Sequence, residues 1–174
     1  MGMFTITESF QKSSKELAVE KMLLDVEASY KDYCNSSFSE LGIFDYKYSS
    51  KEAKDALGLE EELIYELIDD YVNQIIRSVP KFLEYIQKLE NDKSLGKELD
   101  YSELRDLTHK NLGVAHNLRI RNAEILLREI MIKDDLKYLK SSVKCLELYA
   151  VKLAPDCAYK TYNLMKIKTI FLKS

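Results

Sequence analysis

The apolar residues of this chain recur at intervals of three and four over most of its length, which is the spacing of helices with one buried face. Between the apolar stretches stand serine, aspartate, glycine or proline residues, which commonly begin or end helices. The pattern predicts helices over residues 14–35, 51–57, 60–90, 100–118, 123–132, 135–153 and 156–172. We therefore expect an all-α fold, an antiparallel four-helix bundle with additional N- and C-terminal helices.

Three of the predicted helices have apolar stripes that are wide enough to line a core. In the helix over 60–90, which should bend at Pro80, the stripe consists of Leu63, Ile64, Leu67, Ile68, Tyr71, Val72, Ile75, Ile76, Val79, Leu83 and Ile86. In the helix over 100–118 it consists of Leu104, Leu107, Asn111, Val114 and Leu118. In the helix over 135–153 it consists of Leu136, Leu139, Val143, Leu146, Ala150 and Leu153. We assign residues 1–57 to an N-terminal helix and connector packed on the bundle, and residues 58–174 to the bundle itself, within one domain.

Composition narrows the possible functions. The 174 residues include 26 basic and 29 acidic side chains, mixed along the chain, which gives a formal charge of −3. A nucleic-acid-binding domain usually has a basic excess, so nucleic acid is not the expected partner. No apolar run approaches the roughly 20 residues that span a bilayer, so we expect no membrane insertion. The three cysteines lack paired spacing and no signal peptide begins the chain, which favours a cytoplasmic location.

Candidate chemistry is concentrated in the fourth predicted helix. His109 lies one turn before Gly113, and a glycine within a helix costs about 1 kcal/mol relative to alanine. Because glycine has no side chain, a partner molecule would have close access to the imidazole at this turn. Residues three or four apart share a helix face, so Arg105, His109, Gly113 and His116 line up, with Leu112 beside them. The helix is therefore expected to present a histidine on the side opposite its apolar stripe.

From His109 the sequence reads His-Lys-Asn-Leu-Gly-Val-Ala-His-Asn-Leu. It resembles the phosphoacceptor helix of histidine-containing phosphotransfer (HPt) domains of bacterial phosphorelays, which carries His-x-x-Lys-Gly, then small residues, then Asn-Leu. His109 matches the acceptor, Gly113 the glycine, Ala115 a small position, and Asn117 and Leu118 the closing pair. Upstream, residues 58–71 and the proline after Val79 resemble the preceding helix of the family, so that the resemblance covers roughly residues 58–153.

The resemblance implies a function in a two-component phosphorelay. His109 would accept a phosphoryl group and pass it to or from a receiver aspartate, with Gly113 giving access and with Lys110 and Arg105 as electrostatic support. The residues expected to contact the partner are Leu112, His116, Arg119 and Arg121. That partner would be a response-regulator receiver domain or a sensor histidine kinase. Because the receiver would supply the Mg²⁺ and the aspartate, no cofactor is expected in this chain, which would act as a monomer or homodimer.

Two departures from the motif leave alternatives open. Leu112 stands in place of the motif lysine, and Asn111 stands where the family usually has a core-facing leucine. Loss of a charged donor to phosphate removes about 1.5–3 kcal/mol. The alternative is therefore a degenerate HPt-like bundle that binds and regulates a partner without catalysis, followed by an unrelated helical bundle. A metal site is not expected, because His109 and His116 lie about 10.5 Å apart along a helix, too far to share one ion.

Overall fold

The computed structural model describes residues 12–43 and 47–173 of the chain. Every regular element in this part is helical, so the all-α class is confirmed for the described residues. The elements are α1 (Ser14–Ser37), the 3₁₀ helix η1 (Ser39–Leu41), α2 (Ser50–Leu57), α3 (Glu61–Ser94), α4 (Ser102–Asn117), α5 (Arg121–Ile132), α6 (Leu136–Leu153) and α7 (Pro155–Lys173). Within the described part, no helix combines the length and apolar character that a bilayer crossing requires.

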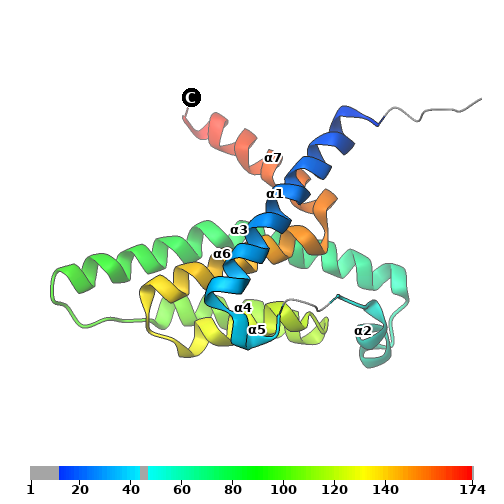
Figure 1. Ribbon diagram of the computed structural model, residues 1–174. Helices are drawn as coiled ribbons and strands as arrows, with labels where there is room; N and C mark the ends of the chain where they lie inside the picture. The colour runs from blue at the N-terminus through cyan, green and yellow to red at the C-terminus, as the bar shows by residue number, and fades with distance from the viewer. Residues whose placement is uncertain (1–11, 44–46, 174) are drawn as a thin grey trace, which may run out of the picture.

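The centre of the fold is a closed arrangement of α3, α4, α5 and α6, which we call the four-helix core. Each of these helices packs against the next one along the chain, and α6 packs back against α3. Figure 1 shows that the four helices run in alternating directions, as the short connections between successive helices favour. With 34 residues, α3 extends for about 51 Å and provides one long side of the core.

The most deeply buried helix is α6, which contacts α1, α3, α5 and α7. All of its predicted stripe is buried except Leu153, which is partly buried. Burial also extends to residues outside that stripe, namely Ser142, Cys145, Leu148, Tyr149 and Val151. The helix is not apolar all round, because four lysines and Glu147 occupy other positions, and of these Lys137 and Lys144 are exposed. Its central position therefore follows from the four helices that pack around it and not from its apolar stripe alone.

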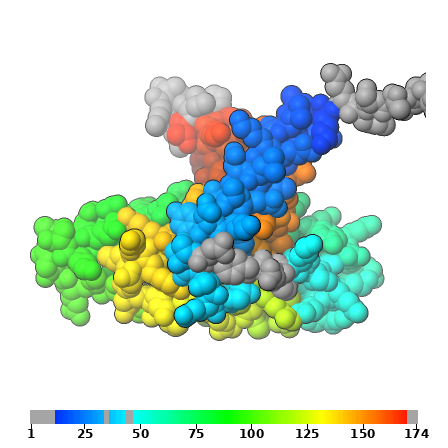
Figure 2. All heavy atoms as spheres, viewed as in Figure 1, coloured from blue at the N-terminus to red at the C-terminus, as the bar shows by residue number. Residues whose placement is uncertain are grey.

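The remaining helices pack on the outside of the four-helix core. Helix α1 contacts α6 and α7, and α2 contacts α3. Figures 1 and 2 show the N-terminal part of α1 and the C-terminal part of α7 projecting from the same side of the core. Near the other end of α1, the Tyr30 hydroxyl donates to the Ile43 carbonyl at 3.1 Å, and Asn122 Nδ2 of α5 donates to the same oxygen at 2.6 Å. These hydrogen bonds attach the connector after α1 to the core.

Capping side chains explain where several helices begin and end. At the start of α1, the Glu16 amide donates to the Ser13 hydroxyl at 3.2 Å and the Ser13 amide donates to the Glu16 carboxylate at 2.7 Å, a reciprocal capping box. At the start of α6, the Asp135 carboxylate accepts the amide hydrogen of Tyr138 at 2.6 Å. Gly58 ends α2 with φ +65°, a left-handed conformation that glycine adopts without strain. Local sequence therefore determines these boundaries.

The buried face of α3 differs from the predicted stripe at two positions. Leu63 and Leu83 were expected in the core, but each is 41% exposed. Phe82, which the stripe omitted, is fully buried. The series Val79–Phe82–Ile86 has the same three-four spacing as Val79–Leu83–Ile86, so periodicity alone does not distinguish them. Near Pro80 the buried face of α3 includes Phe82 and leaves Leu83 at its edge.

Candidate functional site

Helix α4 carries His109 and packs against α3 on one side and α5 on the other. Its contact with α3 includes Asn111, which is 1% exposed and lies on the core face as predicted. Gln74 Nε2 of α3 donates to Asn111 Oδ1 at 2.9 Å, and Asn111 Nδ2 donates to the Leu107 carbonyl at 2.8 Å. Both ends of the Asn111 amide are thus hydrogen-bonded, which offsets the cost of burying a polar side chain. The bond to Gln74 also fixes the rotation of α4 relative to α3.

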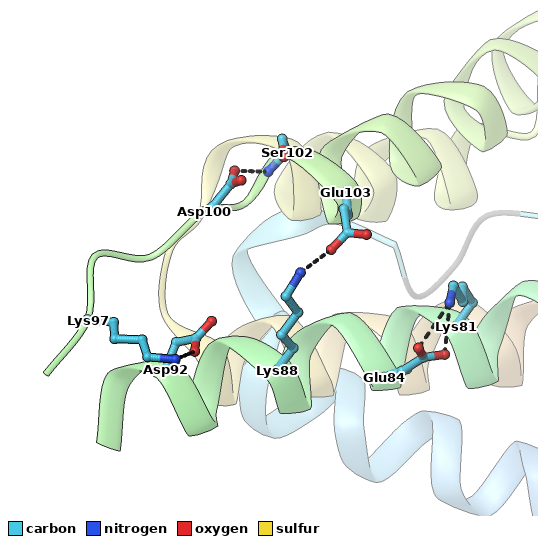
Figure 3. A network of polar contacts seen from close by, with 8 residues as sticks. All are labelled: Lys81, Glu84, Lys88, Asp92, Lys97, Asp100, Ser102 and Glu103. Carbon is cyan, nitrogen blue, oxygen red and sulfur yellow. Dashed lines mark hydrogen bonds and ion pairs between the residues drawn. The ribbon is translucent and has the colours of Figure 1, made fainter. Parts of the chain in front are cut away.

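The N-terminal end of α4 is attached to α3 by polar contacts on the surface. Figure 3 shows Lys88 of α3 reaching Glu103 of α4, with Nζ and Oε2 2.5 Å apart. Immediately before the helix, the Asp100 carboxylate accepts the amide hydrogen of Ser102 at 2.9 Å, and this hydrogen bond lowers the pKa of the Asp100 carboxyl. An ionised carboxylate at this position favours the first helical turn. The start of α4 is therefore defined by its own sequence and by α3.

The buried face of α4 is rotated relative to the predicted stripe. Three predicted core residues are buried, namely Leu104, Asn111 and Leu118. However, Leu107 and Val114 are only partly buried, whereas Thr108 and Ala115 are fully buried. The Thr108 hydroxyl donates to the Leu104 carbonyl at 2.7 Å, so its polar group is satisfied inside the core. Small side chains at Thr108 and Ala115 allow neighbouring helices to approach α4 closely. Because of this rotation, Gly113 lies on the side of α4 that is farthest from the core.

His109 is exposed on the outer face of α4. Within the described part of the chain, no hydrogen bond or ion pair engages its imidazole. In the neutral form, one ring nitrogen carries a proton and the other has a free lone pair. The side chain thus meets the first requirement for a nucleophile, which is an accessible and unoccupied nitrogen atom.

Gly113 leaves open space one turn after His109. A Cβ atom added at this glycine would meet nothing within 4 Å, and its φ is not positive. Neither close packing nor an unusual backbone conformation therefore requires glycine here. Since glycine weakens a helix interior, the structure shows no structural reason for it. What it does provide is an unobstructed approach to the imidazole.

Gly113→Ala is expected to stabilise the folded protein by about 0.5–1 kcal/mol, because alanine restricts the unfolded chain and the structure has room for its methyl group. Urea denaturation of both proteins measures the change. Ala115→Gly, at the fully buried small residue of the same helix, is the control and is expected to lower stability. A stability loss in Gly113→Ala would show that the glycine is needed by the fold.

The two cations expected to support His109 differ in their surroundings. Arg105 Nη2 is held 2.6 Å from Asp134 Oδ1, and its guanidinium lies 5.0 Å from the centre of the Tyr101 ring. Its Nε–H is buried without a hydrogen-bond partner among the described residues. Lys110 is exposed, and within the described part no ion pair engages it. Arg105 is therefore neutralised by a neighbour, whereas Lys110 keeps a charge available to a partner.

His116 belongs to a polar cluster at the boundary of α4 and α5. Its Nδ1 lies 3.1 Å from Glu124 Oε1, and Arg128 Nη2 donates to the same oxygen at 2.7 Å. Arg119, whose φ is +57°, places Nη1 3.4 Å from His116 Nε2 and donates to the His116 carbonyl at 3.1 Å. Burial would raise the pKa of the Glu124 carboxyl, but the hydrogen bonds from Arg128 and His116 outweigh it and lower that pKa. Glu124 is therefore an ionised anchor between the two helices.

Glu124→Gln is expected to lower stability by up to about 1 kcal/mol near pH 7, since its cationic partners are largely exposed and screened. A carboxyl with a lowered pKa stabilises the fold above its ordinary value of 4.5 and loses that contribution as the pH falls through the lowered pKa. The deficit of the variant should therefore shrink in acid. Thermal unfolding of both proteins at pH 7 and at pH values below 4.5 measures this deficit. A deficit that does not change with pH would contradict the role assigned to Glu124.

The structure does not bring all of the predicted site residues together. Leu112 is partly buried and packs against the core. Arg121 lies at the start of α5, where Nη2 donates to both carboxylate oxygens of Glu52 in α2 at 2.7 and 2.8 Å. Arg121 therefore lies close to α2. It follows the C-terminal end of α4, which is itself about 12 Å along the helix from His109. Arg105, His109, Lys110 and His116 do share the outer part of α4.

Sequence reasoning missed the contribution of α5 to this surface. Glu124 and Arg128 are four residues apart, a spacing that predicts an ion pair on a helix. The sequence does not show that this pair would lie beside His116. In the part of the chain that the structure describes, no three histidine, cysteine or acidic side chains gather as metal ligands would.

Comparisons of this chain with protein-family models, with curated proteins and with solved structures gave no match.

Proposed function

We propose that this protein is a histidine phosphotransfer module of the HPt type, in which His109 accepts a phosphoryl group from a receiver aspartate or a sensor kinase and passes it on. One observation carries the proposal: an exposed, unengaged imidazole lies one turn before a glycine that neither packing nor backbone conformation requires. The alternating directions of the helices of the four-helix core are those that the resemblance to HPt domains implies.

The chemistry that this proposal requires from the chain is modest. The lone pair of the unprotonated His109 nitrogen attacks phosphorus, and the bond between phosphorus and the aspartyl oxygen of the receiver breaks. The electron pair of that bond leaves on the carboxylate, while the other ring nitrogen keeps its proton. The receiver contributes Mg²⁺, and α4 contributes position and access. Lys110 adds a positive charge that attracts the acidic pocket of a receiver.

Leu112 supports a second candidate function, that of a non-catalytic interaction module. The HPt motif has a lysine at this position, whereas the leucine packs partly into the core and offers no charge to a phosphoryl group. An exposed α4 face that binds a receiver and blocks its other partners would regulate it by occupancy alone. Such a module would need the shape of the α4 surface but not the nucleophilicity of His109.

Transfer of radioactive phosphate from a phosphorylated receiver or kinase of the same cell separates the two functions. Phosphohistidine is labile in acid and stable in alkali, whereas an acyl phosphate on aspartate is labile in alkali. We expect the protein to take up acid-labile, alkali-stable label when it is mixed with its cognate donor. Complex formation without label would support the interaction module, and neither label nor complex with any receiver of the cell would contradict both.

A further inference from the structure

A phosphoryl group on His109 would need a cation that α4 does not provide at the expected position. Leu112 occupies the place of the motif lysine. Lys110 follows His109 by one residue, so it points about 100° away around the helix. Arg105 lies one turn before His109, on the side away from Leu112, and its guanidinium is partly buried, with Nε enclosed and Nη2 bound to Asp134 at 2.6 Å. No cation of α4 therefore lies at the place of the motif lysine, and we look for the compensating charge on a neighbouring helix.

Two contacts fix the register between α4 and α5. His116 Nδ1 of α4 lies 3.1 Å from Glu124 Oε1 of α5, close to the turn that joins the helices. Arg105 Nη2 lies 2.6 Å from Asp134 Oδ1, just beyond the other end of α5. In two antiparallel helices, the residue number rises along one helix as it falls along the other, so the numbers of facing residues add to a nearly constant sum. The two contacts meet this condition. Positions between them can therefore be matched across the boundary.

Matching the two helices places Arg128 opposite Leu112. One turn along α4 from His116 is Leu112, and one turn along α5 from Glu124 is Arg128, each about 6 Å farther from the connecting turn. Arg128 also shares the helix face of Glu124, because they are four residues apart and their side chains are bonded. It therefore lies across the α4–α5 boundary at the same height as the missing lysine, and one turn from His109.

We propose that Arg128 of α5 supplies the cation that the phosphoryl group on His109 requires, in place of the motif lysine; this inference rests on the proposed function. The Arg128 side chain is 58% exposed, so it has room to move. In the unphosphorylated protein its guanidinium is held by Glu124 at 2.7 Å. Glu124 also bonds to His116, so the carboxylate keeps a partner when Arg128 turns to the phosphoryl group. A phosphoryl dianion attracts the guanidinium more strongly than a single carboxylate does.

Phosphoramidate, a small phosphoryl donor that releases ammonia, tests this role without a protein partner. The chain contains only two histidines, so His116 is kept in every variant, and His109→Gln measures any label that His116 takes, which is subtracted from the label of the other proteins. Arg128→Gln is expected to lower the initial labelling rate about tenfold or more, because a charge-assisted hydrogen bond to the incoming phosphoryl group is lost. Arg77→Gln is the matched control: it removes the same charge from α3, where Arg77 bonds to Asn73 at 2.8 Å.

Two further variants separate a direct role from a structural one. Arg128→Lys keeps the charge and should retain most of the labelling rate. Leu112→Lys combined with Arg128→Gln returns a lysine to the motif position and should restore labelling, which a repair of folding alone would not do. Equal rates for Arg128→Gln and Arg77→Gln, or no restoration by Leu112→Lys, would overturn the inference. The proposed function fails separately, if the wild-type chain accepts no phosphoryl group from any receiver or kinase of the cell.

Discussion

His109→Gln is expected to remove all of the acid-labile label that the wild-type protein takes from a phosphorylated receiver or a kinase. Glutamine is close to histidine in size and polarity, but its amide nitrogen has no lone pair available to attack phosphorus. Because His109 is exposed and no hydrogen bond or ion pair among the described residues engages it, its replacement should leave stability within about 0.5 kcal/mol of the wild type. Loss of label with unchanged thermal unfolding is therefore the predicted combination.

The second histidine provides the control for this experiment. His116→Gln should still yield a labelled protein, because His116 is bonded to Glu124 and lies two turns from His109. Binding of His109→Gln to the receiver, measured by calorimetry, should persist, since the substitution changes the nucleophile and not the surrounding surface. Label that survives in His109→Gln and disappears in His116→Gln would show that His116 is the phosphoacceptor, which would contradict the proposal.

Phe82→Ala is expected to destabilise the protein by about 3–5 kcal/mol, the largest stability effect that we predict. The Phe82 ring is fully buried, so its removal loses apolar burial and leaves a cavity that the surrounding helices fill only in part. A loss of this size is comparable to the total stability of many domains. Urea or thermal unfolding followed by circular dichroism measures it.

The adjacent residue is a matched control for the position of the α3 face. Leu83 is 41% exposed, so Leu83→Ala should cost only about 1 kcal/mol, because the side chain is partly buried and its removal leaves no enclosed cavity. Two neighbouring apolar residues would thus differ several-fold in effect. Similar losses for both variants, or a larger loss for Leu83→Ala, would mean that α3 is rotated relative to the structure described here.

The number and order of the helices follow from sequence because capping and periodicity are local properties. Asp135, for example, begins α6 by bonding to the amide of a residue three positions later. The rotation of each helix is less predictable, since it depends on neighbours that are distant in sequence. In α4, hydrophobicity favours Leu107 and Val114 for the core, whereas the structure buries Thr108 and Ala115. Small residues fit at these positions because neighbouring helices pack closely against α4, and the hydrophobic pattern does not predict where such close packing occurs.

The residues of the candidate site likewise form two groups: those whose position follows from α4 alone and those whose position depends on neighbouring helices. The exposure of His109 and the position of Gly113 follow from α4 alone, so the sequence contains both. The pairing of Arg105 with Asp134 depends on how the next helix ends, and the proximity of His116 to Glu124 depends on the turn between α4 and α5. A single sequence shows these side chains as separate charges. Their arrangement is a property of the packed helices.

The unequal packing of α4 and α6 has a consequence for how the protein opens. Amide hydrogens exchange with solvent through local unfolding, and the cost of that unfolding rises with the interactions that must be broken. Since α6 contacts α1, α3, α5 and α7, whereas α4 packs mainly against α3 and α5, deuterium should enter the backbone of α4 well before that of α6. The helix that carries the histidine would then be the one that a binding partner protects most.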